Sequence, residues 1–133
     1  MADVRKFALE QTAVIHIRDG ADNLMYADKE EAKPMQIHVY GPGTKAYAAA
    51  EKRNTDRMME NLRRKGKAAD AAEMRVDFLS AITKSFENID YDALKDEALH
   101  RAVYSDTSIR FIADQVNAYV GDTVNFTKNS QKS

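Results

Sequence analysis

Two of the three histidines lie in stretches where alternating polarity predicts β-strands, and imidazole is a common metal ligand. His16 lies within Thr12 to Arg18, and His38 lies within Met35 to Tyr40. Pairing of these strands could bring both rings together, but a zinc site typically needs three or four converging ligands. No dense ligand motif surrounds either residue. We therefore favour solvated histidines over a metal site, and we extend this interpretation to His100, which lies in a charged helical stretch.

The turn from Gly41 to Lys45 (Gly-Pro-Gly-Thr-Lys) leaves a predicted strand and enters a predicted helix. Backbone N–H groups in such a place can hold a phosphate. However, the phosphate-loop motif needs four residues between its first glycine and a Gly-Lys pair, and that order fails here. Glycines that tolerate positive φ on both sides of a proline suffice to redirect the chain. We expect a structural turn, with Thr44 capping the helix that follows.

Groups that could perform catalysis are scarce. The chain has no cysteine, and the acidic residues Asp90, Asp92, Asp96 and Glu97 lack the alternating ligands and central glycine of a calcium loop. No serine lies in a nucleophile elbow, and no histidine lies next to a plausible nucleophile. We therefore expect a protein that is not an enzyme and that has no cofactor, no metal and no catalytic residue.

Composition limits the classes of partner. The 133 residues include 20 basic and 21 acidic side chains, a net charge of −1, which argues against nucleic-acid binding. The basic segment Arg53 to Lys67 has no interleaved aromatic residues, so we interpret it as a solvated helix face. No apolar run approaches 18 residues, and Met1 to Lys6 do not form a secretory signal. These features predict a soluble intracellular protein that does not bind a membrane.

Three stretches before residue 105 have helical periodicity. Lys45 to about Arg64 has a narrow apolar stripe and many charges, which predicts a surface helix. Met74 to Phe86 places apolar residues at four-residue steps and is the most hydrophobic of the three. We expect it to be the core helix. Asp92 to Tyr104 is the third, whereas Asn23 to Ala27, with Leu24, Met25 and Tyr26, fits a short strand or a turn of helix.

The fourth helix lies within Tyr104 to Phe126, and we expect the rest of the chain to be organised around it. Ser105 or Asp106 can cap this helix, and Gly121 can end it. One apolar face at helical spacing needs a surface to pack on, and it comprises Ile109, Ile112, Val116 and either Tyr119 or Val120. We interpret this helix as a docking element.

The fold class that follows is α+β and mostly α-helical, with a small N-terminal antiparallel β-sheet or hairpin followed by about four helices. A chain of this length can form one core, so we predict a single domain over residues 1–126. Residues 127–133 are polar and too short to bury much apolar surface. We expect a flexible C-terminal tail there.

Five short segments occur in a fixed order between Met35 and Phe126. The strand and turn from Ile37 to Thr44 lead into an alanine-rich charged helix, and four segments follow: Phe78 to Thr83, Val103 to Asp106, Ile112 to Val116 and Val120 to Phe126. This succession resembles the tail assembly chaperones of long-tailed bacteriophages. The family commonly has a tryptophan after the Phe-Leu-Ala-x-x-Thr-like segment, and this chain has none, so Phe86 or a neighbour must take that place. Asp90 to His100 replaces a glycine-rich stretch of the family.

The resemblance implies a non-catalytic protein of phage morphogenesis in the host bacterial cytoplasm. Such a protein keeps the tape-measure protein soluble and helps to recruit the major tail (tube) protein, and the resemblance leaves a homo-oligomer open. In these families a longer form often arises by frameshifting near the end of the short reading frame, which would fall in residues 127–133. A tape measure is a long helix-rich chain whose apolar stripes a chaperone can cover by helix packing.

Our hypothesis places the partner contact on the last predicted helix and the segment behind it, at Ile109, Ile112, Val116, Asn125 and Phe126. For Phe126 we favour the alternative that its ring packs back over that helix. Two other classes of protein stay open. One is a structural tail or connector subunit that is retained in the virion, and the other is a small enzyme or ligand-binding domain with a deep pocket of converging polar groups.

Overall fold

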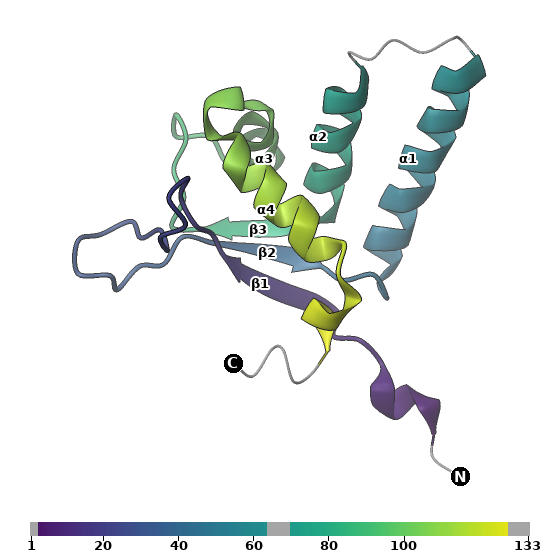
Figure 1. Ribbon diagram of the computed structural model, residues 1–133, viewed down its shortest axis with the longest axis horizontal. Coiled ribbons are helices and arrows are strands. Elements are labelled where there is room, and N and C mark those ends of the chain that lie inside the picture. Colours follow the sequence, from purple (N-terminus) through teal and green to yellow (C-terminus); the bar gives the residue numbers. More distant parts are fainter. Residues whose placement is uncertain (1–2, 64–69, 128–133) are drawn as a thin grey trace.

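The computed structural model describes residues 3–63 and 70–127. Four α-helices and three strands occur in this part of the chain, which confirms the predicted α+β class. Figure 1 shows the four α-helices on one side of the sheet. In chain order the elements are η1 (Val4–Phe7), β1 (Thr12–His16), β2 (Gln36–Tyr40), α1 (Lys45–Arg63), α2 (Asp70–Ile82), β3 (Thr83–Glu87), α3 (Asp96–Ser105), η2 (Thr107–Ile109), α4 (Arg110–Val120) and η3 (Thr123–Phe126).

The sheet is antiparallel in the order β1-β2-β3, so the prediction of a purely N-terminal sheet was wrong. The third strand comes after α2 and pairs with β2, with Ile37 opposite Phe86. On β1 and β2 the predicted alternation is confirmed, because Ala13, Ile15, Ile37 and Val39 are buried beneath the helices. The residues between them lie on the opposite face.

The predicted core helix also ends earlier than expected, at Ile82 rather than Phe86. The Thr83 hydroxyl donates a hydrogen bond to the Leu79 carbonyl oxygen at 2.7 Å, which satisfies an acceptor of the last helical turn. The next residues gain a ladder of hydrogen bonds to β2. Apolar residues at four-residue steps continue into the strand, so this local pattern could not reveal where the helix ends.

Two further element predictions need correction. Helix α3 begins at Asp96, not Asp92. Asp92, Ala93 and Asp96 have positive φ values of 54°, 57° and 54°, so right-handed helical backbone cannot form before Asp96. The stretch from Asn23 to Ala27 is neither a strand nor a helix, and it pairs through isolated bridges, of Leu24 to Arg18 and of Tyr26 to Pro34. The predictions for residues 64–69 and for the tail at 128–133 fall outside the described residues.

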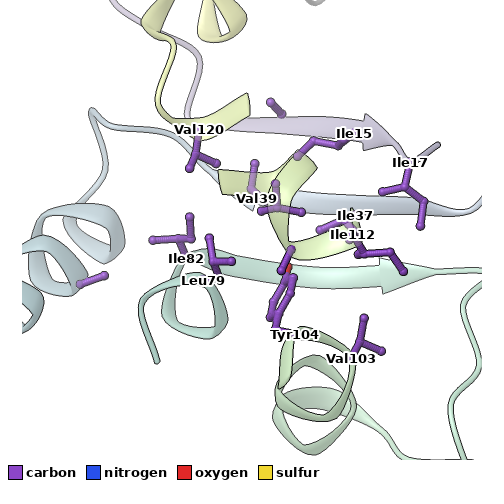
Figure 2. Close-up of a cluster of buried hydrophobic side chains, with 14 of the residues drawn as sticks. Ile15, Ile17, Ile37, Val39, Leu79, Ile82, Val103, Tyr104, Ile112 and Val120 are labelled. Atoms are coloured by element: carbon purple, nitrogen blue, oxygen red, sulfur yellow. The ribbon is translucent and has the colours of Figure 1, made fainter. Parts of the chain in front are cut away.

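The hydrophobic core lies between the sheet and helices α2, α3 and α4 (Figure 2). Each of these elements contributes side chains that are almost completely buried. Helix α1 contributes only Tyr47 and Ala50 to the buried set, so most of α1 extends beyond the core (Figure 1). The core residues labelled in Figure 2 are Ile15, Ile17, Ile37, Val39, Leu79, Ile82, Val103, Tyr104, Ile112 and Val120.

The turn before α1 confirms one prediction and corrects another. The Thr44 Oγ1 atom accepts a hydrogen bond from the backbone N–H of Tyr47 at 3.2 Å, so Thr44 caps the helix as expected. No glycine in the described part of the chain has positive φ, so the turn does not use that conformational freedom. Gly41 is needed for space instead. A Cβ atom there would lie 2.7 Å from the Glu10 carbonyl oxygen and 2.9 Å from Phe126 Cδ1.

Candidate binding surfaces

The apolar face of α4 packs on the protein's own core. Ile112, Val116 and Phe126 are buried, whereas Ile109 and Asn125 are half-buried. The Phe126 ring packs back against Tyr119 of α4 with 5.8 Å between ring centroids, as in the alternative that we favoured. In this conformation the three buried residues are covered by the chain itself. Of the five predicted contact residues, a partner could reach only Ile109 and Asn125 directly.

The remaining sequence predictions for this region concern the helix ends. Asp106 caps η2, the short turn before α4, by accepting a hydrogen bond from the Ser108 N–H at 2.9 Å. Gly121 follows the last residue of α4 and donates its N–H to the Asn117 carbonyl at 3.2 Å. Helix α4 therefore begins and ends within the predicted stretch from Tyr104 to Phe126.

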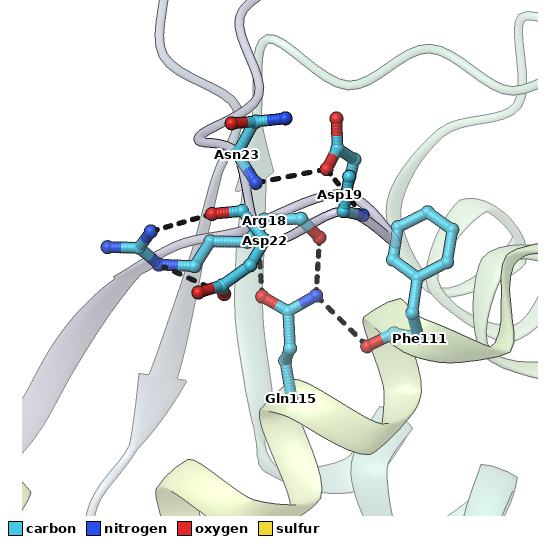
Figure 3. A network of polar contacts seen from close by, with 7 residues as sticks. Arg18, Asp19, Asp22, Asn23, Phe111 and Gln115 are labelled. Atoms are coloured by element: carbon cyan, nitrogen blue, oxygen red, sulfur yellow. Dashed lines mark hydrogen bonds and ion pairs between the residues drawn. The ribbon is translucent and has the colours of Figure 1, made fainter.

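The side chain of Gln115 connects α4 to the loop after β1 through hydrogen bonds (Figure 3). Its side-chain oxygen accepts from the Arg18 N–H at 2.7 Å, and its Nε2 donates to the Arg18 carbonyl at 2.5 Å and to the Phe111 carbonyl at 3.0 Å. The side-chain amide of Gln115 thus makes a pair of hydrogen bonds to the backbone N–H and carbonyl of Arg18, as a residue of a neighbouring strand would. The Asp19 carboxylate closes the adjoining turn by accepting from the Asn23 N–H at 3.0 Å. Sequence reasoning did not identify Gln115.

The outer half of α1 carries an exposed apolar surface. Met58, Met59 and Leu62 are 52%, 58% and 73% exposed, and we call these three residues the methionine surface. Met58 and Leu62 are four residues apart and therefore share one side of the helix. Arg53 precedes Met58 by five residues, so it lies about 140° away around the helix. The methionine surface thus faces away from the cationic side of α1.

The cationic side of α1 borders a cleft of about 710 Å³ between α1, α2, the start of β3 and α3, which we call the polar cleft. Asp77 of α2 joins the flanking helices, because its carboxylate accepts hydrogen bonds from Arg57 of α1 and from Arg101 of α3, the latter at 2.6 Å. Burial by itself would raise the pKa of Asp77. The hydrogen bonds and positive charges of Arg101 and Arg57 outweigh it and hold the pKa below its usual value.

His100 lines the same cleft and is buried, so its interpretation as a solvated residue was wrong. Its ring lies on Phe86 of β3 with centroids 4.4 Å apart, a contact that depends on the unpredicted strand. Burial lowers the pKa of His100, and the nearby carboxylates of Asp96 and Glu97 only partly oppose this shift. The imidazole is therefore neutral at pH 7.

Ser80 and Thr83 are two buried hydroxyl groups at the cleft with different surroundings. Thr83 Oγ1 donates to Leu79, so it accepts from the Tyr104 hydroxyl at 2.6 Å. Burial raises the pKa of Tyr104 far above its usual value and keeps it protonated. Ser80 is 7% exposed, and its Oγ atom has no hydrogen-bond partner among the described residues. A buried hydroxyl without a partner is uncommon in proteins.

The charged side chains that line the polar cleft fall into two groups. Asp77 forms ion pairs with both Arg57 and Arg101. By contrast, Arg53 and Lys84 have no ion pair or side-chain hydrogen bond within residues 3–63 and 70–127, and neither do the exposed acids in the first turn of α3, Asp96 and Glu97. The cleft therefore has two cations that form no ion pair with a described carboxylate.

The two strand histidines each have a local partner. His16 Nε2 lies 2.9 Å from the Met25 carbonyl oxygen, and His38 Nε2 lies 3.0 Å from a carboxylate oxygen of Glu87. The structure does not bring their rings into a shared ligand set. Within the described ranges, no three His, Cys, Asp or Glu side chains are close enough to hold a metal ion.

Sequence reasoning missed the polar cleft, although one signal was available. Asp77 is the only acidic residue between Glu73 and Glu87, within the most hydrophobic stretch of the chain. A carboxylate in an apolar stripe needs a cationic partner. From the sequence we identified the basic segment of α1, but we interpreted the arginines that line the cleft as solvated. Nothing local distinguishes Ser80 from an ordinary helix serine.

Comparison of the chain with protein-family models, with curated protein sequences and with solved structures finds no match. The described helices include none that combines the length and the apolar character needed to cross a bilayer.

Proposed function

We propose that this protein is a tail assembly chaperone of a long-tailed bacteriophage that acts in the host bacterial cytoplasm. It binds the tape-measure protein, keeps it soluble and helps to recruit the major tail protein. The single observation that carries the proposal is the methionine surface, an exposed apolar stripe on the part of α1 that extends beyond the core. The order of short segments from Ile37 to Phe126 supports it by resemblance.

The chemistry of the methionine surface suits this role. Methionine is unbranched and polarizable, so it adapts to partners of varying shape. An unassembled tape measure exposes successive apolar stripes along its helices, and each stripe differs in detail. A helix that offers Met58, Met59 and Leu62 can cover such stripes by side-by-side packing, and it releases them when the tube subunits arrive. No covalent bond is made or broken in this mechanism.

The proposal moves the partner contact from α4 to α1. Burial of Ile112, Val116 and Phe126 commits the apolar face of α4 to the core, where it holds the domain together. Helix α1 buries only Tyr47 and Ala50, so its outer half can accept a partner without any change in the core. Ile109 of η2 and Asn125 of η3 flank α4, are half-buried and stay as secondary candidates.

Co-expression with a fragment of the tape-measure protein tests the proposal. The wild-type chain should raise the soluble fraction of the fragment, and Met58→Gln/Leu62→Gln should remove most of that effect, because glutamine keeps the helix propensity but not the apolar surface. The matched control is Ala48→Gln/Ala49→Gln, which introduces the same residues at exposed positions nearer the start of α1. This control should solubilise the fragment as the wild type does.

Two results would contradict the proposal. One is equal solubilisation by Met58→Gln/Leu62→Gln and by the wild type, which would show that α1 makes no contact. The other is a stoichiometric amount of this chain in finished phage particles, measured by mass spectrometry. That finding would favour a structural tail or connector subunit, because a chaperone leaves before assembly is complete.

A further inference from the structure

We propose that the polar cleft is a binding site for a single oxyanion, a carboxylate or phosphate group, which Arg53, Lys84 and the Ser80 hydroxyl hold. This inference goes beyond the proposed chaperone activity and does not depend on it. The cleft's volume of about 710 Å³ lies within the usual range for small-ligand sites. Its three ligand-binding groups come from α1, α2 and β3.

The Ser80 hydroxyl is the first argument for a ligand. It is 93% buried and lines the cleft, yet its Oγ atom has no hydrogen-bond partner in the part of the chain that the structure describes. Serine in a helix commonly satisfies its hydroxyl on the carbonyl four residues earlier, as Thr83 does with Leu79. Ser80 leaves this hydrogen bond unmade. Its Oγ atom is enclosed in this rotamer, so the side chain must rotate about χ1 to donate to an acceptor in the cleft. An oxyanion is the strongest class of acceptor for such a group.

The second argument is the distribution of charge. Among the described residues, four cationic and three acidic side chains line the cleft. Asp77 is already neutralised by Arg57 and Arg101, so it does not neutralise the remaining cations. Asp96 and Glu97 occupy the first turn of α3, where the positive end of the helix dipole favours carboxylates. Arg53 and Lys84 thus supply positive charge that lacks an ion-pair partner in residues 3–63 and 70–127.

The same acids limit what the cleft can accept. Asp96 and Glu97 are exposed at the α3 side and repel a ligand with several negative charges. A polyanion such as nucleic acid therefore fits poorly, whereas one carboxylate or phosphate can lie near the cations and away from the acids. Apolar lining from Ala50, Met74 and Phe78 excludes part of the water, which strengthens attraction between charges.

An NMR titration of the uniformly ¹⁵N-labelled chain tests the inference. Sodium phosphate and sodium acetate are added in separate experiments at constant ionic strength, balanced with sodium chloride. We expect saturable shifts of the backbone amide signals of Ser80, Lys84 and His100 with at least one of the two anions. Saturation by phosphate alone identifies a phosphate site, and saturation by acetate identifies a carboxylate site. Linear, unsaturated shifts with both anions would overturn the proposal.

Variants show whether the named groups hold the anion. Arg53→Gln/Lys84→Gln should raise the dissociation constant about tenfold, the usual loss when charge-assisted hydrogen bonds are removed. Ser80→Ala should raise it several-fold. Lys52→Gln is the matched control, because Lys52 lies on the same helix but pairs with Asp56 at 2.8 Å and does not line the cleft. Equal dissociation constants for the wild type and Arg53→Gln/Lys84→Gln would refute the site.

The titration separates this inference from the chaperone proposal. It contains no partner protein, so a failure of anion binding leaves the co-expression result unaffected, and the reverse also holds. Arg53 and Lys84 are exposed, so their replacement by glutamine does not disturb the core. Circular dichroism of each variant verifies that the fold is intact before the titration.

Discussion

Replacement of Phe126 by alanine should destabilise the whole domain, although this residue lies in the last described turn. The ring is completely buried, and the Phe126 carbonyl accepts from the Glu10 N–H at 2.7 Å. Truncation of a buried phenylalanine typically costs about 3–5 kcal/mol, and domains are stable by only about 5–15 kcal/mol. We therefore expect Phe126→Ala to remove about 4 kcal/mol from the free energy of unfolding.

Urea unfolding followed by circular dichroism measures this change. For an m-value of about 2 kcal/mol/M, a loss of about 4 kcal/mol lowers the unfolding midpoint by about 2 M. Val124→Ala is the matched control, because Val124 belongs to the same turn, η3, and is 64% exposed. Its cost should stay within about 0.5 kcal/mol. A loss below about 1 kcal/mol for Phe126→Ala would refute the conclusion that η3 completes the core.

A double-mutant cycle with Gly41 extends the test. Gly41→Ala should be destabilising, because the new Cβ atom would lie 2.9 Å from Phe126 Cδ1 and 2.7 Å from the Glu10 carbonyl oxygen. In the Phe126→Ala background the ring no longer opposes the methyl group, so the cost of Gly41→Ala should fall. It should not vanish, since the Glu10 carbonyl remains. Strict additivity of the two changes would contradict this account of the turn.

Three further predictions concern the residues around the polar cleft. Tyr104→Phe leaves Thr83 without its hydroxyl donor and should lower the free energy of unfolding by about 1–2 kcal/mol, measured by urea unfolding. Asp77→Asn should cost about 1 kcal/mol, because its arginine partners are partly solvated, and the cost should shrink in high salt. Because the pKa of folded His100 lies below 6.5, the unfolded chain protonates first, so stability should fall as pH decreases below about 6.5. His100→Gln should weaken this pH dependence, measured by urea midpoints at several pH values.

Local patterns predicted the elements that local interactions determine. The alternation around Ile37 identified β2, the hydroxyl of Thr44 identified the start of α1, and Gly121 identified the end of α4. In each case the relevant contact lies within a few residues along the chain. Side-chain alternation and capping are properties of such short stretches, so the sequence was sufficient for them.

The third strand and the polar cleft depend on contacts between distant segments. Phe86 continues the apolar spacing of the helix before it, and only pairing with Ile37 identifies its segment as a strand. His100 is buried because that strand provides the Phe86 ring. The cleft needs α1, α2, β3 and α3 together, and only the isolated carboxylate of Asp77 gave a local indication of it. The candidate oxyanion site could not be predicted without the tertiary arrangement.

The direct junction between α2 and β3 has a mechanical consequence. Helix α2 ends at Ile82 and β3 begins at Thr83, so no linker residue separates them. A tilt of α2 therefore displaces β3 at the edge of the sheet, and the hydrogen bonds between β3 and β2 resist that displacement. Load applied at the far end of the α1–α2 pair is transmitted into the sheet with no hinge to absorb it.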